Sequence, residues 1–241
     1  MTAPQEPMLV WERPEPPSRP APSPLSRERI VRAAIDLADR DGLDAVSLRK
    51  VAAALDAGPM RLYGYLSTKE ELLDLMVDEV YGEIVPSGSA GPAGPSGDDW
   101  RAALTELARR TREAALRHEW FADLLGSRPR LGPNALAYLE ASLACLGDTA
   151  VGTVVRVVST VNAYVLGAVR REVTELRAER ATGMDEQAYQ AARGPYLARM
   201  LATGRYPAVA RFVEGEDVDP DFDEGLEYVL DGVAPLVSGG R

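Results

Sequence analysis

The stretch SLRKVAAALDAGPMRLYGYLSTKEELLDLM, from Ser47 to Met76, decides the fold of this chain. Ser47 is a good N-cap, and apolar residues follow it at helical spacing. The helix breaks at Asp56–Gly58, and Pro59 then suits the first turn of a new helix because its missing N–H is not needed there. Two short helices joined by a three-residue turn that contains glycine predict a helix-turn-helix.

The second of these helices, expected over Pro59–Leu66, is too short to bury much area, with only Leu62 and Leu66 facing inward. Such a helix is explained if its exposed face enters a DNA major groove. Arg61 can donate two hydrogen bonds to guanine O6 and N7. Tyrosine hydroxyls, Lys69 and the backbone amides that begin the next helix can hold phosphates. The outward positions are expected to be Met60, Arg61, Gly64 and Tyr65.

Helices are also predicted on both sides of this motif. The one before it begins after the N-cap Ser26, where Leu25 and Ile30 are spaced for a hydrophobic staple, and it ends at Gly42. The one after it begins at a capping box, Ser67–Glu70. A plain three-helix packing unit that binds no nucleic acid is the alternative interpretation of the motif alone.

The composition predicts an all-α protein of two domains. Residues 1–24 are rich in proline and expected to form a disordered tail, in which Trp11 is interpreted as solvated, with docking on a partner as the alternative. A three-helix helix-turn-helix domain is expected over 25–85, a flexible linker over 86–97, and a helical ligand-binding and dimerisation domain over 98–241. Helices of the second domain are expected near Asp98–His118, Glu119–Leu125, Gly132–Leu146, Thr149–Glu179, Asp185–Thr203, Pro207–Glu214 and Phe222–Val237.

Charge and composition narrow the class of function. The formal net charge is -10, yet residues 25–70 hold eight Lys/Arg against seven Asp/Glu, so the acidity belongs to the rest of the chain. The single cysteine and single histidine argue against a disulfide framework and a His/Cys metal site. The N-terminus lacks a signal-peptide pattern, and the longest uncharged apolar stretch, Val157–Val169, is too short to span a bilayer. We therefore expect a cytoplasmic protein without membrane contact, metal or cofactor.

The segment over residues 25–85 resembles the DNA-binding domain of the TetR family of bacterial transcriptional regulators. The resemblance is strongest in AAIDLADRDGLDAVSLRKVAAAL, in LYGYL and in the lysine of STKEEL. The part from WRAALTELAR to the valine-rich helix is similar to the tetracycline-repressor type of C-terminal domain. Four residues depart from the family pattern: Asp56 stands for a frequent glycine, Tyr65 for histidine and Leu66 for phenylalanine, and Gly64 replaces a bulkier residue.

The resemblance assigns roles to individual side chains. It implies that Ser47 and Arg49 contact phosphate and base, that Arg61 is the main base reader, and that Tyr63 and Lys69 clamp the backbone. The expected partner is a palindromic double-stranded DNA operator. The complete set of expected DNA-binding residues is Ser47, Arg49, Met60, Arg61, Tyr63, Gly64, Tyr65 and Lys69.

Two further expectations concern the second domain. The helix from Thr149 to Glu179 is apolar on nearly every face up to Val169, and the last helix carries an apolar stripe, so both are expected to pair with a second copy in a homodimer. The alternative is that both stripes are core. A small-molecule effector is expected in a pocket with aromatic walls and polar anchors. Its expected lining is Trp100, Trp120, Phe121, Asn134, Tyr138, Asn162 and Tyr164, with ordinary core packing as the alternative for each.

The predicted function is that of a ligand-responsive repressor, which a small molecule releases from its operator. No catalytic constellation is present in the sequence: there is no glycine-rich phosphate loop and no nucleophile elbow. Two alternatives stay open, a helical ligand-binding protein that has lost DNA binding and an enzyme on an all-helical scaffold.

Overall fold

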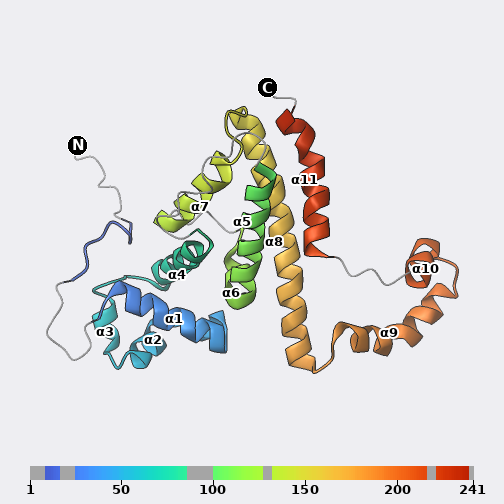
Figure 1. The fold of residues 1–241 in the computed structure, drawn as a ribbon. Coiled ribbons are helices and arrows are strands. Elements are labelled where there is room, and N and C mark those ends of the chain that lie inside the picture. Colours follow the sequence, from blue (N-terminus) through green and yellow to red (C-terminus); the bar gives the residue numbers. More distant parts are fainter. Residues whose placement is uncertain (1–8, 17–24, 86–99, 127–131, 216–220, 239–241) are drawn as a thin grey trace, which may run out of the picture.

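The computed structural model describes residues 9–16, 25–85, 100–126, 132–215 and 221–238. All regular elements in these residues are helical, which confirms the predicted all-α fold. The expected linker lies outside the described residues, as do the first eight and the last eight residues of the expected tail. Figure 1 shows a small group of helices beside a larger one, with helix α4 between them.

The smaller group, the head, contains the predicted helix-turn-helix. Ser26 accepts a hydrogen bond from the backbone N–H of Arg29, and Ser47 accepts one from that of Lys50, so both predicted N-caps are confirmed. Leu25 and Ile30 are both buried, as the staple requires. The head consists of α1 (Arg27–Asp41), the short 3-10 turn η1 (Leu43–Ala45), α2 (Leu48–Ala54), α3 (Pro59–Leu62) and α4 (Lys69–Ile84).

Two predictions are wrong here, one about the end of α3 and one about the N-cap of α4. Helix α3 ends at Leu62 and not at Leu66, because the chain turns there to bury Tyr65 and Leu66. The capping box lies one residue later than predicted. Thr68 is the N-cap and accepts from the N–H of Glu71, whose carboxylate accepts from the N–H of Ser67 at 2.6 Å.

The turn between α2 and α3 contains a strained residue. Asp56 has a φ of 49°, in the left-handed region that glycine adopts without cost. Aspartate tolerates this region better than most residues, at a cost on the order of 1 kcal/mol. The departure from the glycine frequent at this position therefore leaves the turn intact.

The larger group of helices is built around one long helix. Helix α8, of 32 residues, packs against α5 and α11, with α6 and α7 joining the head to this group (Figure 1). Boundaries agree with those predicted to within a few residues. The helices are α5 (Trp100–Arg117), α6 (Glu119–Leu124), α7 (Pro133–Ala144), α8 (Val151–Thr182), α9 (Glu186–Leu201), α10 (Pro207–Glu214) and α11 (Phe222–Ser238).

The apolar stripe of α11 packs within the chain and is not left for a partner. Its residues Phe222, Leu226, Leu230, Val233 and Val237 are buried, and α11 lies along α8. This stripe therefore belongs to the core of the chain itself, which was the alternative interpretation. The residues of α11 that remain exposed and apolar are different ones, Tyr228 and Leu236.

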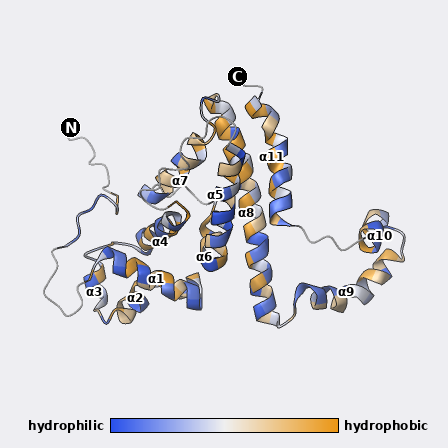
Figure 2. Cartoon of the chain, viewed as in Figure 1, coloured by the Kyte–Doolittle hydropathy of each residue, from blue (hydrophilic) through white to orange (hydrophobic). Residues whose placement is uncertain are grey.

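Helix α8 is the helix in the described residues that is long and apolar enough, by length and composition, to cross a membrane. Core helices of soluble proteins meet the same criterion. Its buried valines are Val154, Val157, Val158, Val161, Val165, Val169 and Val173, whereas Val151 and Val155 near its start are exposed. Figure 2 shows the apolar residues gathered in the first part of α8 and hydrophilic ones toward its end.

Part of the expected disordered tail has a defined position. Residues 9–16 lie against the head: Val10 is buried, and the Arg13 guanidinium binds the carboxylate of Glu71 on α4. The expectation of disorder is therefore wrong for these residues. Trp11 is half-buried against the core and not solvated. Packing Val10 and Trp11 removes apolar surface from water, and this gain outweighs the conformational entropy that the proline-rich segment loses.

Candidate DNA-binding face and regulatory core

The head presents most of the predicted DNA-binding side chains on its surface. Met60 is 80% exposed and Tyr63 is 50% exposed, although an isolated methionine or tyrosine would gain from burial. Arg49, Arg61 and Gly64 are exposed as well, and Lys69 and Ser47 are partly so. Helix α3 and the residue that follows it thus turn Arg61, Met60 and Tyr63 outward, as a groove-binding element requires.

Tyr65 is the exception among the predicted DNA-binding residues. Its side chain is only 7% exposed, and its hydroxyl donates a 2.8 Å hydrogen bond to the backbone carbonyl of Leu25. The ring is therefore part of the head's core and not of its DNA-facing surface. The helical spacing that placed it outward fails because α3 ends at Leu62.

The backbone after α3 is held by side chains from elsewhere in the head. Leu62 and Leu66 are fully buried and anchor α3 on both sides of the turn. The Arg27 guanidinium donates to the backbone carbonyl of Tyr65 at 3.4 Å. Because α3 has only four residues, these long-range contacts fix its orientation and its own hydrogen bonds do not.

A group of aromatic side chains lies where α4, α6 and α7 meet. The ring of Tyr81 lies edge-on to Phe121 at 5.4 Å and tilted to Tyr138 at 5.1 Å between centroids. The Tyr138 hydroxyl donates to the side-chain oxygen of Asn162 on α8 at 3.2 Å. We call these four residues the aromatic core. Phe121, Tyr138 and Asn162 were predicted to line the pocket. Tyr81 was not predicted, although it lies one helical turn after the apolar Val77 and therefore on the same face of its helix.

Burial controls the ionisation of the two tyrosines. It raises the pKa of Tyr81 to about 12, with smaller contributions from Tyr138 and Asp78. Burial likewise raises the pKa of Tyr138, against the opposing effect of hydrogen bonds with Thr111 and Ser142. Both hydroxyls therefore stay protonated at neutral pH and can act as hydrogen-bond donors to a ligand.

Four of the predicted pocket residues lie outside the aromatic core. The indole N–H of Trp120 donates to Asp39 of α1 at 2.7 Å, so this side chain lies between the domains. The Tyr164 hydroxyl donates to the Phe222 carbonyl, which places it between α8 and α11. Trp100 begins α5, and the length of that helix, ~27 Å for its 18 residues, separates it from Phe121.

Asn134, the fourth, joins α7 to α4. Its side-chain amide donates to the backbone carbonyl of Asp78, and the Asp78 carboxylate accepts from the N–H groups of Asn134 and Ala135 at the start of α7. Burial raises the pKa of Asp78, and the two backbone N–H groups oppose that shift. A buried carboxylate at a helix N-terminus is electrostatically favoured, so this contact fixes the middle of α4 to α7.

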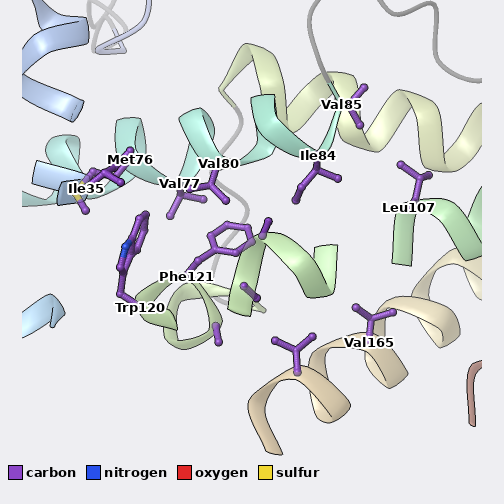
Figure 3. Packing of buried hydrophobic residues seen from close by; sticks show 14 of the residues in the cluster. Ile35, Met76, Val77, Val80, Ile84, Val85, Leu107, Trp120, Phe121 and Val165 are labelled. Atoms are coloured by element: carbon purple, nitrogen blue, oxygen red, sulfur yellow. The ribbon is translucent and has the colours of Figure 1, made fainter. Parts of the chain in front are cut away.

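The only histidine of the chain ties the two groups of helices together. His118 is 6% exposed, with Nδ1 at 2.9 Å from both oxygens of Asp39 on α1 and Nε2 at 3.2 Å from Oε1 of Glu83 on α4. Arg117 binds the other oxygen of Glu83. Figure 3 shows the neighbouring Trp120 and Phe121 directed toward the residues of α4. Asp39, Glu83, His118 and Trp120 form what we call the domain junction.

A helix-turn-helix head with a short, exposed recognition helix, carried on a larger helical domain, defines a DNA-binding transcriptional regulator. The sequence matches two family profiles: "Bacterial regulatory proteins, tetR family" over residues 30–76, and "Tetracyclin repressor-like, C-terminal domain" over residues 92–237. The chain belongs to the TetR family of transcriptional regulators. It is a DNA-binding transcriptional regulator.

Relatives extend over nearly the whole chain. The HTH-type transcriptional repressor DrrR1 of Streptomyces coeruleorubidus is 39% identical over 97% of this chain and 86% of its own length. An HTH-type transcriptional regulator of Saccharopolyspora erythraea is 36% identical over 95% of this chain and 92% of its own. Among solved structures, ActR of Streptomyces coelicolor in complex with actinorhodin aligns with a TM-score of 0.73 at 27% identity, covering 88% of this chain and 97% of that one.

Replacing Arg61 and Lys69 separately distinguishes base reading from phosphate binding. Arg61→Ala should lose about 1–3 kcal/mol of operator binding and relax the choice at one base position, because a two-pronged contact to guanine disappears. Lys69→Ala should weaken binding to all duplexes alike. Fluorescence anisotropy with operator and random duplexes measures both. Equal losses on the two duplexes for Arg61→Ala would remove Arg61 as a base reader.

Replacing His118 tests the domain junction. His118→Phe should lower the free energy of unfolding by about 1–3 kcal/mol, because Asp39 and Glu83 both lose their contact with an imidazole nitrogen. His118→Gln keeps one amide donor and should lose less. Urea unfolding followed by circular dichroism measures the change. Stability of His118→Phe within about 0.5 kcal/mol of the wild type would show that the junction contributes no net stabilisation.

Proposed function

We propose that the chain acts as a homodimeric repressor that binds a palindromic operator through paired α3 helices and leaves it when an aromatic small molecule enters the aromatic core. One observation carries this proposal. Helix α4 has Lys69 at its first turn, beside the DNA-facing surface, and Tyr81 of the aromatic core near its end. A ligand that displaces Tyr81 therefore displaces the support of α3.

The domain junction also connects the aromatic core with the head. Phe121 of the aromatic core is adjacent to Trp120, whose ring lies 6.3 Å away and whose indole binds Asp39 of α1. A ligand in contact with Phe121 thus acts on α1 as well as on α4. Coupling of this kind is typically about 1–3 kcal/mol and is reciprocal, so DNA weakens ligand binding by the same factor.

Three observations favour an aromatic ligand. The aromatic core offers ring faces and edges from Tyr81, Phe121 and Tyr138, which pack well against aromatic molecules. The Tyr138 hydroxyl and Asn162 supply polar groups that orient a ligand. The similar structure of ActR was solved with actinorhodin bound.

The exposed side of α8 supports a second copy of the chain as the partner. Val151 is 78% exposed and Val155 is 51% exposed, and Tyr228 and Leu236 of α11, which packs on α8, are exposed as well. The outlying α9 and α10 also expose apolar side chains, with Phe212 83% exposed (Figure 1). Lipid is a poorer occupant of this side of α8, because Arg156 is exposed in its first part. An operator with twofold symmetry requires a twofold protein.

The proposal includes no catalytic step. Binding DNA and a small molecule requires only differential affinity for two arrangements of the helices. Operator binding also places the protein with the bacterial DNA in the cytoplasm. Selecting bound fragments from genomic DNA tests the whole proposal: we expect a palindromic site with half-sites about one helical turn apart or a multiple of it. Failure to enrich any sequence at low salt would instead support a ligand-binding protein without DNA binding.

The oligomeric state gives a direct prediction. Light scattering at micromolar concentration should give twice the chain mass, and Val155→Asp should shift it toward the monomer because a charge is then buried at the interface. Leu136→Asp, the same change at an exposed position of α7, is the matched control and should stay dimeric. A wild-type protein that remains monomeric would overturn the dimer.

The aromatic core gives a second prediction, with actinorhodin as the probe. The probe should quench the tryptophan fluorescence of the wild type, and Tyr138→Phe should weaken its binding up to about tenfold through loss of one hydrogen bond. Tyr196→Phe, at an exposed tyrosine on α9, is the control. Operator affinity without the probe should be unchanged in both variants. Binding of the probe with equal affinity to wild type and Tyr138→Phe would place the ligand elsewhere.

A further inference from the structure

The segment over residues 9–16, which we call the arm, is bound to the chain that follows α3 and to the first turns of α1 and α4. Its backbone forms a turn, with the N–H of Glu12 donating to the carbonyl of Leu9 at 3.1 Å, and Val10 and Trp11 pack into the core. The arm is thus an ordered element, although it lies outside the helices that match the family profile, which begins at residue 30.

Arg13 connects the arm to the turn between α3 and α4. Its guanidinium donates to the Ser67 hydroxyl at 2.9 Å and to both carboxylate oxygens of Glu71. The Glu71 carboxylate also accepts from the backbone N–H of Ser67. Burial raises the pKa of Glu71, but the hydrogen bonds from Arg13 and Ser67 outweigh burial and hold that pKa below its ordinary value. The carboxylate that caps α4 is therefore charged and paired at neutral pH.

The arm also holds the start of α1. The Glu15 carboxylate accepts from the backbone N–H of Arg27 at 3.1 Å, and the Arg27 guanidinium donates to the Arg13 carbonyl at 2.9 Å. The same guanidinium reaches the Tyr65 carbonyl. Hydrogen bonds therefore link the arm, α1 and the turn after α3 to one another.

Gly64 explains how the arm comes so close to α3. A Cβ at this position would lie 3.3 Å from Cγ of Pro16 and 3.4 Å from the Arg61 carbonyl, tighter than ordinary contacts. The absence of a side chain at Gly64 makes room for Pro16. At the position where the family has a bulkier residue, this chain therefore places Pro16 of the arm beside Gly64.

We propose that the arm is a working part of the DNA-binding head and that Arg13 is a positioning residue for the recognition helix. Helix α3 has four residues and is too short to hold its own orientation. Arg13 binds Ser67 and Glu71, and so fixes the part of the chain that runs from α3 into α4. The guanidinium is engaged with Ser67 and Glu71, so it acts through the protein and not on a phosphate.

The test uses the full-length protein and the operator duplex obtained by selection. Arg13→Ala should weaken operator binding about tenfold, with the slope of log affinity against log salt unchanged and binding to random duplex unchanged. An arginine that binds phosphate directly would instead reduce the salt slope by about one and weaken both duplexes alike. Arg40→Ala, which removes one exposed positive charge at the far end of α1, is the matched control and should bind as the wild type does.

A second pair of variants keeps the test valid if Arg13→Ala is unstable. Gly64→Ala should crowd Pro16 and lower operator affinity, and Pro16→Ala in the same chain should restore most of it, because the crowding group is then gone. Operator affinity of Arg13→Ala within twofold of the wild type, or a reduced salt slope, would overturn the role of Arg13. Lack of rescue by Pro16→Ala would overturn the role of the arm at Gly64.

This inference rests on the proposed use of α3 as the recognition helix, and the two can fail separately. A wild-type protein that binds no duplex contradicts the proposed function. A wild-type protein that binds its operator, and whose Arg13→Ala and Gly64→Ala variants bind it equally well, contradicts the arm alone.

Discussion

Helix α4 is the element on which the rest of the molecule depends, because it belongs to both groups of helices. Its first turn is capped by Thr68 and Glu71 and holds the end of the recognition helix. Its last turns carry Tyr81 of the aromatic core and Glu83 of the domain junction. The 16 residues of an α-helix span about 24 Å and bend little, so a change at one end cannot be absorbed before it reaches the other.

Local sequence rules predicted the elements well and their mutual contacts less well. The N-caps of α1 and α2, the stripes and the helix-turn-helix follow from residues a few positions apart, and they were predicted from the sequence. Tyr65 was placed wrongly, and Trp120 and Tyr164 lie apart from the aromatic core, because each binds a backbone or side-chain oxygen between 40 and 81 residues away. Aromatic residues with a polar tip satisfy that tip wherever the fold allows it, and a period of 3.6 residues carries no information about such partners.

The departures from the family pattern are consistent with one another once the arm is included. Gly64 lacks a side chain, which leaves room for Pro16 beside it. Tyr65 turns inward and its hydroxyl binds Leu25, just before α1. Both changes shift the support of α3 from its own side chains to the chain that precedes α1. A proline-rich composition suggested disorder for this segment, but two apolar side chains and one arginine are enough to fix eight residues.

The position of Asp78 determines how a small movement in the aromatic core is transmitted. Its buried carboxylate is bound by two N–H groups at the start of α7, which makes it the fixed point of α4. Tyr81 lies three residues beyond this point and Lys69 nine residues before it, or ~4.5 Å and ~13.5 Å along the helix. A tilt about Asp78 therefore moves the head end about three times as far as the ligand end. In the dimer that we propose, a displacement of about 1 Å at Tyr81 would become several ångströms across the two recognition helices, which is enough to disturb their spacing on the operator.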